Sequence, residues 1–436
     1  MLRNTEFSVA GSLGEVAISG EGQIENLLAP KKPRGVLTMT GPNAEYLTDI
    51  LGITPITTGP LDLDASIKLS GDQLATSIRG AFGEFDIDAK GRFLELGNLD
   101  GIDLRLLASG PDASAVAALA GLKDLPSHAF TVDAAIGSED GDLVVERVSV
   151  ELGATSLGVS GRFPAFPSPV GAVATLTLAG PELGEYSSLL GLPGALTGSF
   201  DVALNLAELP GGDASLTVSA ESKDVKLSVE GTIADTEGHA GSRFDVSGQG
   251  KSFRPVGRAI GFDAAPDVPF DFQGTLSLAE NNIVLDQGSA SLGSDDIDVS
   301  GFLGYQPLEK DTDVGFEVIG PDIASTLRAW GYATGRLPAE RFSVTGNLQS
   351  AKDHFELADI RASIGDADGF TIALNGQLSA ETDLVGSAFH VEAKGPNLAA
   401  LTDVLEIPNV PVAEFDIRAG VERVSDGWAF DDGEAV

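Results

Sequence analysis

Glycine recurs at a fixed interval along this chain. Gly91, Gly161, Gly231 and Gly301 are evenly spaced, and Gly22 and Gly376 extend the series at nearly the same spacing. A second glycine follows each of these six repeat glycines at a constant offset, at Gly41, Gly110, Gly180, Gly250, Gly320 and Gly395. Self-similarity at a fixed period indicates one structural repeat, here of about 70 residues, that packs on copies of itself. We therefore predict a single repeat array over 1–436, with repeats at about 1–40, 41–109, 110–179, 180–249, 250–319, 320–394 and 395–436, the first and last being partial.

Composition limits the function classes. The chain has 65 acidic and 27 basic residues and a net charge of −38. Such a surface repels phosphate backbones, so we expect no nucleic-acid partner. The absence of cysteine excludes disulfides and thiolate metal sites. The 54 glycines and 22 prolines, together with short runs rich in Val, Leu, Ile and Thr, favour β-structure with frequent turns.

A short amphipathic helix is predicted near the start of each repeat. Five of the six second glycines are followed by proline, as at Gly180-Pro181. Proline suits the first helical position because it lacks an N–H group. About ten residues later comes a glycine of the kind that ends helices, at Gly52, Gly121, Gly191, Gly261 and Gly331. Between these signals apolar residues occur at helical spacing, for example Leu183, Tyr186 and Leu190.

The rest of each repeat alternates between apolar and polar residues. Leu61, Leu63 and Ile67 share one parity, and Asp62 and Asp64 the other. Alternation with a period of two indicates antiparallel strands with one apolar face and one polar face, and about four strands fit in each repeat. The repeat glycines have the parity of the apolar face. A glycine inside a strand marks a bulge or a close approach, and we expect the short helix, rather than a ligand, to pack against it.

The predicted apolar face is larger than the predicted helix. Four strands of about nine residues give a face of roughly 19 by 30 Å per repeat. A ten-residue helix is about 15 Å long and covers only about a quarter of that area. The remainder exceeds the exposed apolar patch that soluble monomers usually carry. Either the sheet curls so that apolar faces meet, or an apolar ligand fills an open groove, with candidate lining residues Ile67, Leu69, Phe85, Ile87, Val159, Val202, Leu204, Phe272, Leu276, Ile297 and Val299.

The repeat resembles a known family. Two elements of the repeat are similar to those of AsmA-type proteins of Gram-negative bacteria. One is a Gly-Pro start followed by Leu-Leu-Gly-Leu-Pro (180–193), and the other is a strand that ends in Ile-x-Val-x-Gly-x-Leu (297–303). The resemblance extends over the whole chain. It implies an elongated, twisted antiparallel sheet with an open groove, located in the periplasm and held to the inner membrane by an N-terminal helix. It also implies a role in outer-membrane biogenesis through transfer of phospholipid, with envelope proteins as partners.

The two ends of the sequence bear on this interpretation. No run reaches the roughly 18 apolar residues needed to span a bilayer, and Met1 to Asn4 lead directly into repeat sequence without a signal peptide. Both ends enter or leave a repeat in its middle. We therefore expect the chain to be an internal piece of a longer protein, with the membrane anchor upstream of it.

Residues that could carry catalysis or hold a metal are scattered. His128, His239, His354 and His390 occupy unrelated places in the repeat, so we expect surface histidines and no metal site. The stretch 248–252 departs from a phosphate-binding loop at its first glycine, where Asp245 stands. The acidic segments 138–142 and 365–369 do not recur with the repeat, which favours solvated turns over calcium sites. We expect neither an enzyme nor a cofactor.

Two functions fit this sequence. The first is a non-enzymatic conduit in which acyl chains of phospholipid or another lipid lie on the apolar face of an open groove. The alternative is a structural or adhesive β-solenoid rod of the cell envelope, in which the apolar faces meet and close a core. An upstream membrane helix would favour the first, and an export signal alone would favour the second.

Overall fold

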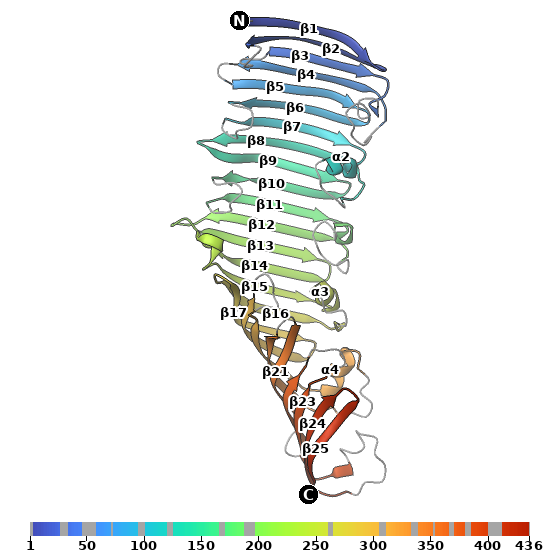
Figure 1. Ribbon diagram of the computed structural model, residues 1–436, viewed down its shortest axis with the longest axis vertical. Coiled ribbons are helices and arrows are strands. Elements are labelled where there is room, and N and C mark those ends of the chain that lie inside the picture. The colour runs from blue at the N-terminus through green and yellow to red at the C-terminus, as the bar shows by residue number, and fades with distance from the viewer. Residues whose placement is uncertain are drawn as a thin grey trace. The chain divides into compact units, whose positions relative to one another are not determined.

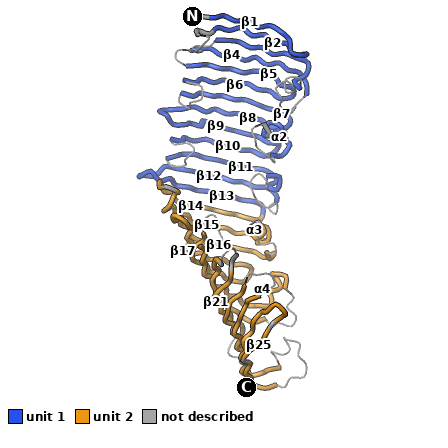
Figure 2. Tube along the Cα trace, in the orientation of Figure 1, with its two compact units in different colours: residues 1–223 blue, residues 224–436 orange. Residues whose placement is uncertain are grey.

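The computed structural model is mainly β with few, short helices, which confirms the predicted fold class. It describes residues 3–26, 34–45, 58–70, 73–94, 101–119, 125–164, 171–186, 197–259, 265–304, 311–332, 339–351, 354–365, 370–379, 385–399 and 412–435. The chain forms two compact units, unit 1 (Met1–Lys223) and unit 2 (Asp224–Val436), which Figure 2 distinguishes by colour. The division falls inside the repeat predicted at 180–249.

Unit 1 is an antiparallel sheet in which the strands follow one another in sequence order (Figure 1). Its strands are β1 (Arg3–Leu13), β2 (Val16–Asn26), β3 (Arg34–Gly41), β4 (Leu61–Ser70), β5 (Gln73–Phe82), β6 (Phe85–Phe93), β7 (Asp103–Gly110), β8 (Phe130–Glu139), β9 (Asp142–Leu152), β10 (Thr155–Phe163), β11 (Val173–Gly180), β12 (Phe200–Glu208) and β13 (Ala214–Ser222). Two short helical segments are described in this unit, α2 (Ala113–Leu119) and the 3₁₀ turn η1 (Leu183–Tyr186).

Unit 2 repeats the same plan. Its strands are β14 (Val225–Ile233), β15 (Arg243–Gly250), β16 (Phe270–Leu278), β17 (Asn282–Leu292), β18 (Asp295–Gly304), β19 (Asp313–Gly320), β20 (Phe342–Ala351), β21 (His354–Gly365), β22 (Thr371–Leu378), β23 (Ala388–Gly395), β24 (Phe415–Val424) and β25 (Gly427–Ala435). Its described helical segments are η2 (Glu237–His239), α3 (Arg254–Ala259) and α4 (Ile323–Ala329).

Within each unit the sheet is an open meander. Each strand pairs antiparallel with the next one along the chain, as β4 pairs with β5 and β16 with β17. Four strands fall in each of the five complete repeats, for example β4–β7 in the repeat at 41–109 and β16–β19 in the repeat at 250–319. The described strands of neither unit form a second, facing sheet. The closed core that the rod alternative requires is therefore not built by these strands.

The best-buried aromatic core lies at the end of the strands where the helices are. In five repeats the first strand begins with a phenylalanine, and in the repeat at 41–109 it begins with Leu61. Phe200, Phe270, Phe342 and Phe415 are buried. Each of these residues pairs across the sheet with a second glycine, as Phe200 pairs with Gly180 and Phe415 with Gly395. A Cβ on Gly395 would lie 2.9 Å from the ring of Phe415, so the second glycines make room for aromatic rings. The sequence pattern alone does not indicate this role, because each glycine and its aromatic partner lie on different strands.

The helix starts differ from the prediction in one detail. The sequence predicts proline at the first helical position, but α4 begins at Ile323, and Asp322 stands between it and Pro321. The Asp322 carboxylate accepts hydrogen bonds from the backbone N–H groups of Ala324 and Ser325, at 3.0 and 3.1 Å. A side-chain acceptor caps the free N–H groups of a first turn, so the proline is displaced to the residue before the cap.

The same cap recurs in other repeats. In each, the side chain of the residue after proline accepts a hydrogen bond from the backbone N–H group two residues later. These residues are Asn43, Asp112, Glu182 and Asn397. Of the predicted helix-ending glycines, Gly331 has a φ of +86°, which is the left-handed conformation that such glycines adopt. The other four, Gly52, Gly121, Gly191 and Gly261, lie outside the described residues.

Within the described residues, the atoms nearest to a Cβ built on each repeat glycine belong to strands and not to a helix, which corrects our expectation. The repeat glycines lie toward the other end of the strands, because Gly91 pairs with Leu104, well before the second glycine at 110. A Cβ on Gly231, Gly301 or Gly376 would collide with a backbone carbonyl of the following strand. Gly301 also has a φ of +139°, which residues other than glycine rarely adopt. The close approach is therefore between neighbouring strands.

Candidate functional site

Strand register assembles uninterrupted apolar rows on one face of each unit. In unit 1 a row crosses every strand, from β1 to β13, through Gly11, Ile18, Met39, Leu63, Gly80, Ile87, Ala108, Val132, Val150, Leu157, Leu178, Val202 and Ala220. The next row on the same face also contains only apolar residues and glycine, and includes Val9, Leu37, Ile78, Val159 and Leu204. No charged side chain interrupts either row.

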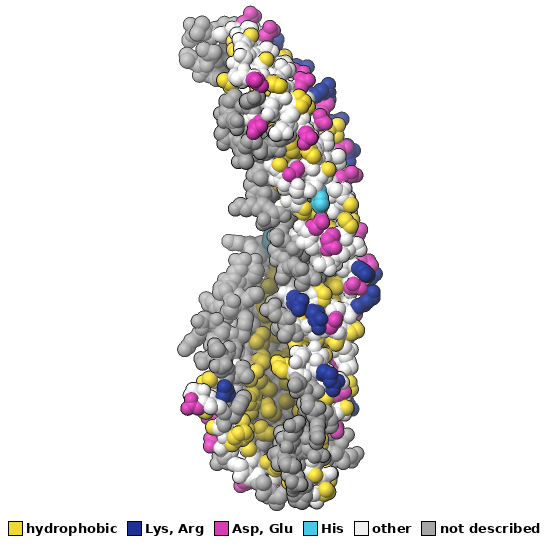
Figure 3. Space-filling model, turned by 90° about the vertical axis from the view of Figure 1, so that its right-hand side faces the viewer, with side chains coloured by type: hydrophobic (Ala, Val, Ile, Leu, Met, Phe, Trp, Pro, Cys, Tyr) yellow, Lys and Arg dark blue, Asp and Glu magenta, His cyan; other side chains and the backbone are white. Residues whose placement is uncertain are grey.

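Unit 2 has a matching row. It runs from β14 to β24 through Leu227, Gly248, Phe272, Ala290, Ile297, Val318, Val344, Ala362, Leu374, Val391 and Ala419. We call the face that carries these rows the apolar face of each unit, and the opposite one the polar face. Figure 3 shows hydrophobic side chains gathered in a hollow in the lower part of the view, which is unit 2, with charged side chains along the opposite margin.

The candidate lining residues all lie on the apolar faces. Those of unit 1 are on β4, β6, β10 and β12, and those of unit 2 are on β16 and β18. Ten of the eleven are neither fully buried nor fully exposed, as expected for a groove with an open side. Phe85 is the exception. It is buried, and its ring centroid lies 6.0 Å from that of Phe130, in the aromatic core at the helix end.

Other apolar-face residues are more exposed than the predicted ones. Val9 on β1 and Ile78 on β5 are 57% and 42% exposed, and Phe7 and Leu37 are exposed as well. All four lie on β1 to β5 of unit 1. Alternation in the sequence assigns these residues to the apolar face, but it cannot say which apolar residues other side chains cover. The first strands of unit 1 therefore carry accessible hydrocarbon that the candidate list omits.

A buried carboxyl group lies on the apolar face of unit 2. Asp295, the first residue of β18, is 6% exposed and occupies the place that Phe85 and Phe370 hold in their repeats. Burial raises the pKa of the Asp295 carboxyl, while a hydrogen bond from the Thr326 hydroxyl, at 2.7 Å, acts in the opposite direction. Because Thr326 belongs to α4, this contact ties the helix to the sheet of unit 2.

The polar residues considered for chemistry have structural partners. The His128 ring lies 2.9 Å from Glu185, and the His239 ring lies 3.1 Å from the Ala234 carbonyl. In the acidic segment at 138–142, Glu139 and Asp142 are ion-paired with Arg162, at 3.3 and 2.5 Å. Residues 366–369 of the second acidic segment lie outside the described part, and so does the side chain of His354.

The segment that resembles a phosphate loop is a strand end. Gly250 closes β15, Lys251 is ion-paired with Asp224 at 3.0 Å, and Ser252 donates to Asp267 at 2.6 Å. In the part of the chain that the structure describes, no group of three or more metal-ligating side chains comes together. None of the described helices is long and apolar enough to cross a bilayer.

Comparison with known proteins adds no relative. No protein-family model, curated protein or solved structure matches this chain.

Proposed function

We propose that this chain is a non-enzymatic lipid conduit, in which the acyl chains of phospholipid or another lipid lie along the apolar faces. The observation that carries the proposal is the pair of adjacent rows in unit 1, which cross all its strands without a charged side chain. A hydrocarbon chain moving across strands along such a row meets only apolar side chains and glycine. It therefore faces no step at which a charge must be desolvated.

Partial exposure of the apolar face supports the same proposal. Residues such as Val159 and Ile297 keep part of their surface accessible although they sit in the middle of strands. Apolar surface in contact with water is unfavourable by roughly 25 cal/mol for each Å². An acyl chain that covers this surface would gain that free energy. The acidic polar face, with the net charge of −38, keeps the protein soluble while the other face is loaded.

The proposed setting follows from the resemblance to AsmA-type proteins. As part of the same proposal, the protein works in the periplasm of a Gram-negative bacterium, attached to the inner membrane, and supplies phospholipid for outer-membrane biogenesis. Envelope proteins would then be its partners. Fractionation of cells that express the gene from its own locus tests this part, because recovery of the protein in the cytosolic fraction would contradict it.

Charged substitutions on the two faces test the conduit directly. The Val159→Asp variant places a carboxylate in an apolar row of unit 1, and the Ser160→Asp variant places the same group on the polar face one position along. Ile297→Asp and Ser300→Asp form the corresponding pair on β18 of unit 2. Purified variants are incubated with radiolabelled phospholipid, and the lipid that co-elutes with each chain is counted.

We expect Val159→Asp and Ile297→Asp to retain less lipid than wild type, and the two serine variants to retain as much. Circular dichroism checks that all four variants are folded. Equal retention by the members of each pair would contradict the proposal, because the acyl chains would then not lie on the apolar face.

A further inference from the structure

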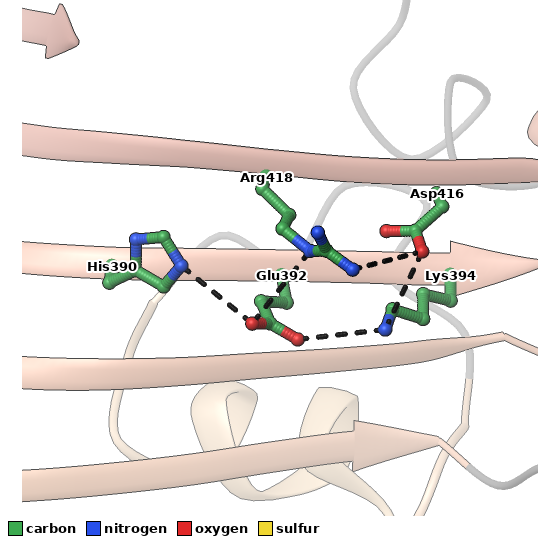
Figure 4. A network of polar contacts seen from close by, with 5 residues as sticks. All are labelled: His390, Glu392, Lys394, Asp416 and Arg418. Carbon is green, nitrogen blue, oxygen red and sulfur yellow. Dashed lines mark hydrogen bonds and ion pairs between the residues drawn. The ribbon is translucent and has the colours of Figure 1, made fainter. Parts of the chain in front are cut away.

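Many cations on the polar face are neutralised by a neighbouring carboxylate. In unit 2, Glu392 and Asp416 lie among three basic side chains on β23 and β24 (Figure 4). Lys394 lies 3.7 Å from Glu392 and 3.5 Å from Asp416, and Arg418 lies 3.4 Å from Asp416. In unit 1 the Arg147 guanidinium donates two hydrogen bonds of 2.8 Å to Asp133. Such pairs are expected on a protein whose carboxylates far outnumber its cations.

One part of the polar face of unit 1 departs from this pattern. A hollow of about 560 Å³ lies over β4 to β7 and is lined by Lys68, Lys90, Arg92 and Arg105, with Asp103 as its single acidic residue. We call it the basic hollow. Four cations against one carboxylate give a local excess of positive charge in a chain whose net charge is −38.

Strand register explains how the charges meet. Lys90 on β6 is directly opposite Arg105 on β7. In the neighbouring row, Ala75 separates Lys68 from Arg92, and Arg92 is opposite Asp103, with which it is ion-paired. Like charges directly opposite one another repel and destabilise a sheet. A bound anion would remove this repulsion.

Among the described residues, two of the four cations have no carboxylate partner. Lys90 lies 3.4 Å from Asp88, and Arg92 is paired with Asp103. Neither Lys68 nor Arg105 forms an ion pair with any residue in the described part of the chain. The Ser66 and Ser77 hydroxyls, 2.7 Å apart, also line the hollow and add hydrogen-bonding groups. The hollow thus combines a guanidinium, an ammonium and hydroxyl groups on one sheet.

We propose that the basic hollow binds a compact anion that carries phosphate groups. Arginine forms paired hydrogen bonds with phosphate oxygens, and lysine adds a point charge. The ligand must be compact because carboxylates stand in the next row along the polar face, at Asp64 on β4 and Asp88 on β6. At physiological salt, charges act over about 8 Å, so an extended polyanion would be repelled at these margins. This site is on the face opposite the apolar rows and does not depend on the proposed lipid conduit.

Calorimetric titration of the whole chain with inorganic pyrophosphate tests the proposal. We expect saturable binding that weakens as salt is raised. Arg105→Glu should weaken it by about tenfold or more, because a charge-assisted pair is lost and a negative charge is added. The same substitution turns a repulsive pair with Lys90 into an attractive one, so its thermal midpoint should equal or exceed that of wild type. Loss of binding therefore cannot be attributed to unfolding.

A control variant and a vesicle-binding measurement complete the experiment. Arg243→Gln removes one positive charge from unit 2, far along the sequence from the hollow, and should bind pyrophosphate like wild type. Absence of saturable binding, or equal weakening by Arg105→Glu and Arg243→Gln, would overturn the proposal. Flotation with vesicles that contain phosphatidic acid distinguishes the source of the phosphate. Arg105-dependent flotation without pyrophosphate binding would also overturn it, because the ligand would then be an extended surface.

Discussion

Phe270→Ala should destabilise unit 2 through the aromatic core at the helix end. Phe270 is 6% exposed, and its ring centroid lies 5.8 Å from that of Phe253 and 6.2 Å from that of Phe272. Removal of the ring forfeits the free energy gained by burying it, breaks both aromatic contacts and leaves a cavity. Substitutions of buried phenylalanine by alanine lower the free energy of unfolding by about 3–5 kcal/mol. With a urea dependence of about 2 kcal/mol per molar, the unfolding midpoint should fall by roughly 1.5–2.5 M.

Phe302→Ala is the matched control for this experiment. Phe302 belongs to the same unit but lies on the polar face and is 37% exposed. Its removal should lower the free energy of unfolding by about 1 kcal/mol or less. Both midpoints are measured by urea unfolding followed by circular dichroism. Equal midpoint shifts for the two variants would refute the assignment of the aromatic core to the helix end of the strands.

Three further predictions concern single positions in the repeat. Gly301→Ala should strongly destabilise unit 2 because its Cβ would meet the carbonyl of Asp313, whereas Gly11→Ala, where the space is open, should leave the urea midpoint close to that of wild type. Asp322→Ala removes the cap of α4 and should lower the urea midpoint by roughly 0.5 M; an unchanged midpoint would contradict the cap. The raised pKa of Asp295 means that the folded state binds the proton of this carboxyl more tightly than the unfolded state does. The stability that the protonated carboxyl contributes is therefore complete below about pH 3.8, and it is lost as pH rises through the raised pKa. The Asp295→Asn variant should therefore gain stability relative to wild type as pH rises through the raised pKa. A difference in the free energy of unfolding that does not change with pH would contradict this.

The arrangement of strands and faces could be predicted from the sequence because alternation has a period of two. Leu61, Leu63 and Ile67 lie on the face that their parity indicates, and four strands occupy each complete repeat. Bulges limit this reasoning. Val145 and Val148 both face the apolar side although one has an odd number and the other an even one, because a bulge inserts an extra residue into β9 opposite β8. A count of parity alone would place one of them on the wrong face.

Features that depend on pairs of strands could not be predicted. The role of the second glycines follows from their position opposite aromatic rings, as at Gly180 and Phe200, which lie on different strands. The basic hollow likewise forms only because register brings Lys90 and Arg105 face to face. Register depends on turn lengths and bulges, and neither is fixed by composition. Burial of Phe85 was missed for a related reason, since its ring packs against Phe130 of the repeat that follows.

Native mass spectrometry of the purified chain tests the central claim most directly. The chain is produced in a Gram-negative host and desalted without detergent, and any lipid is identified after organic extraction. Occupied apolar faces predict a series of peaks above the mass of the bare chain, at intervals that match phospholipids and that Val159→Asp diminishes. A single peak at the bare mass, with no phospholipid in the extract, would contradict the claim that these faces hold acyl chains.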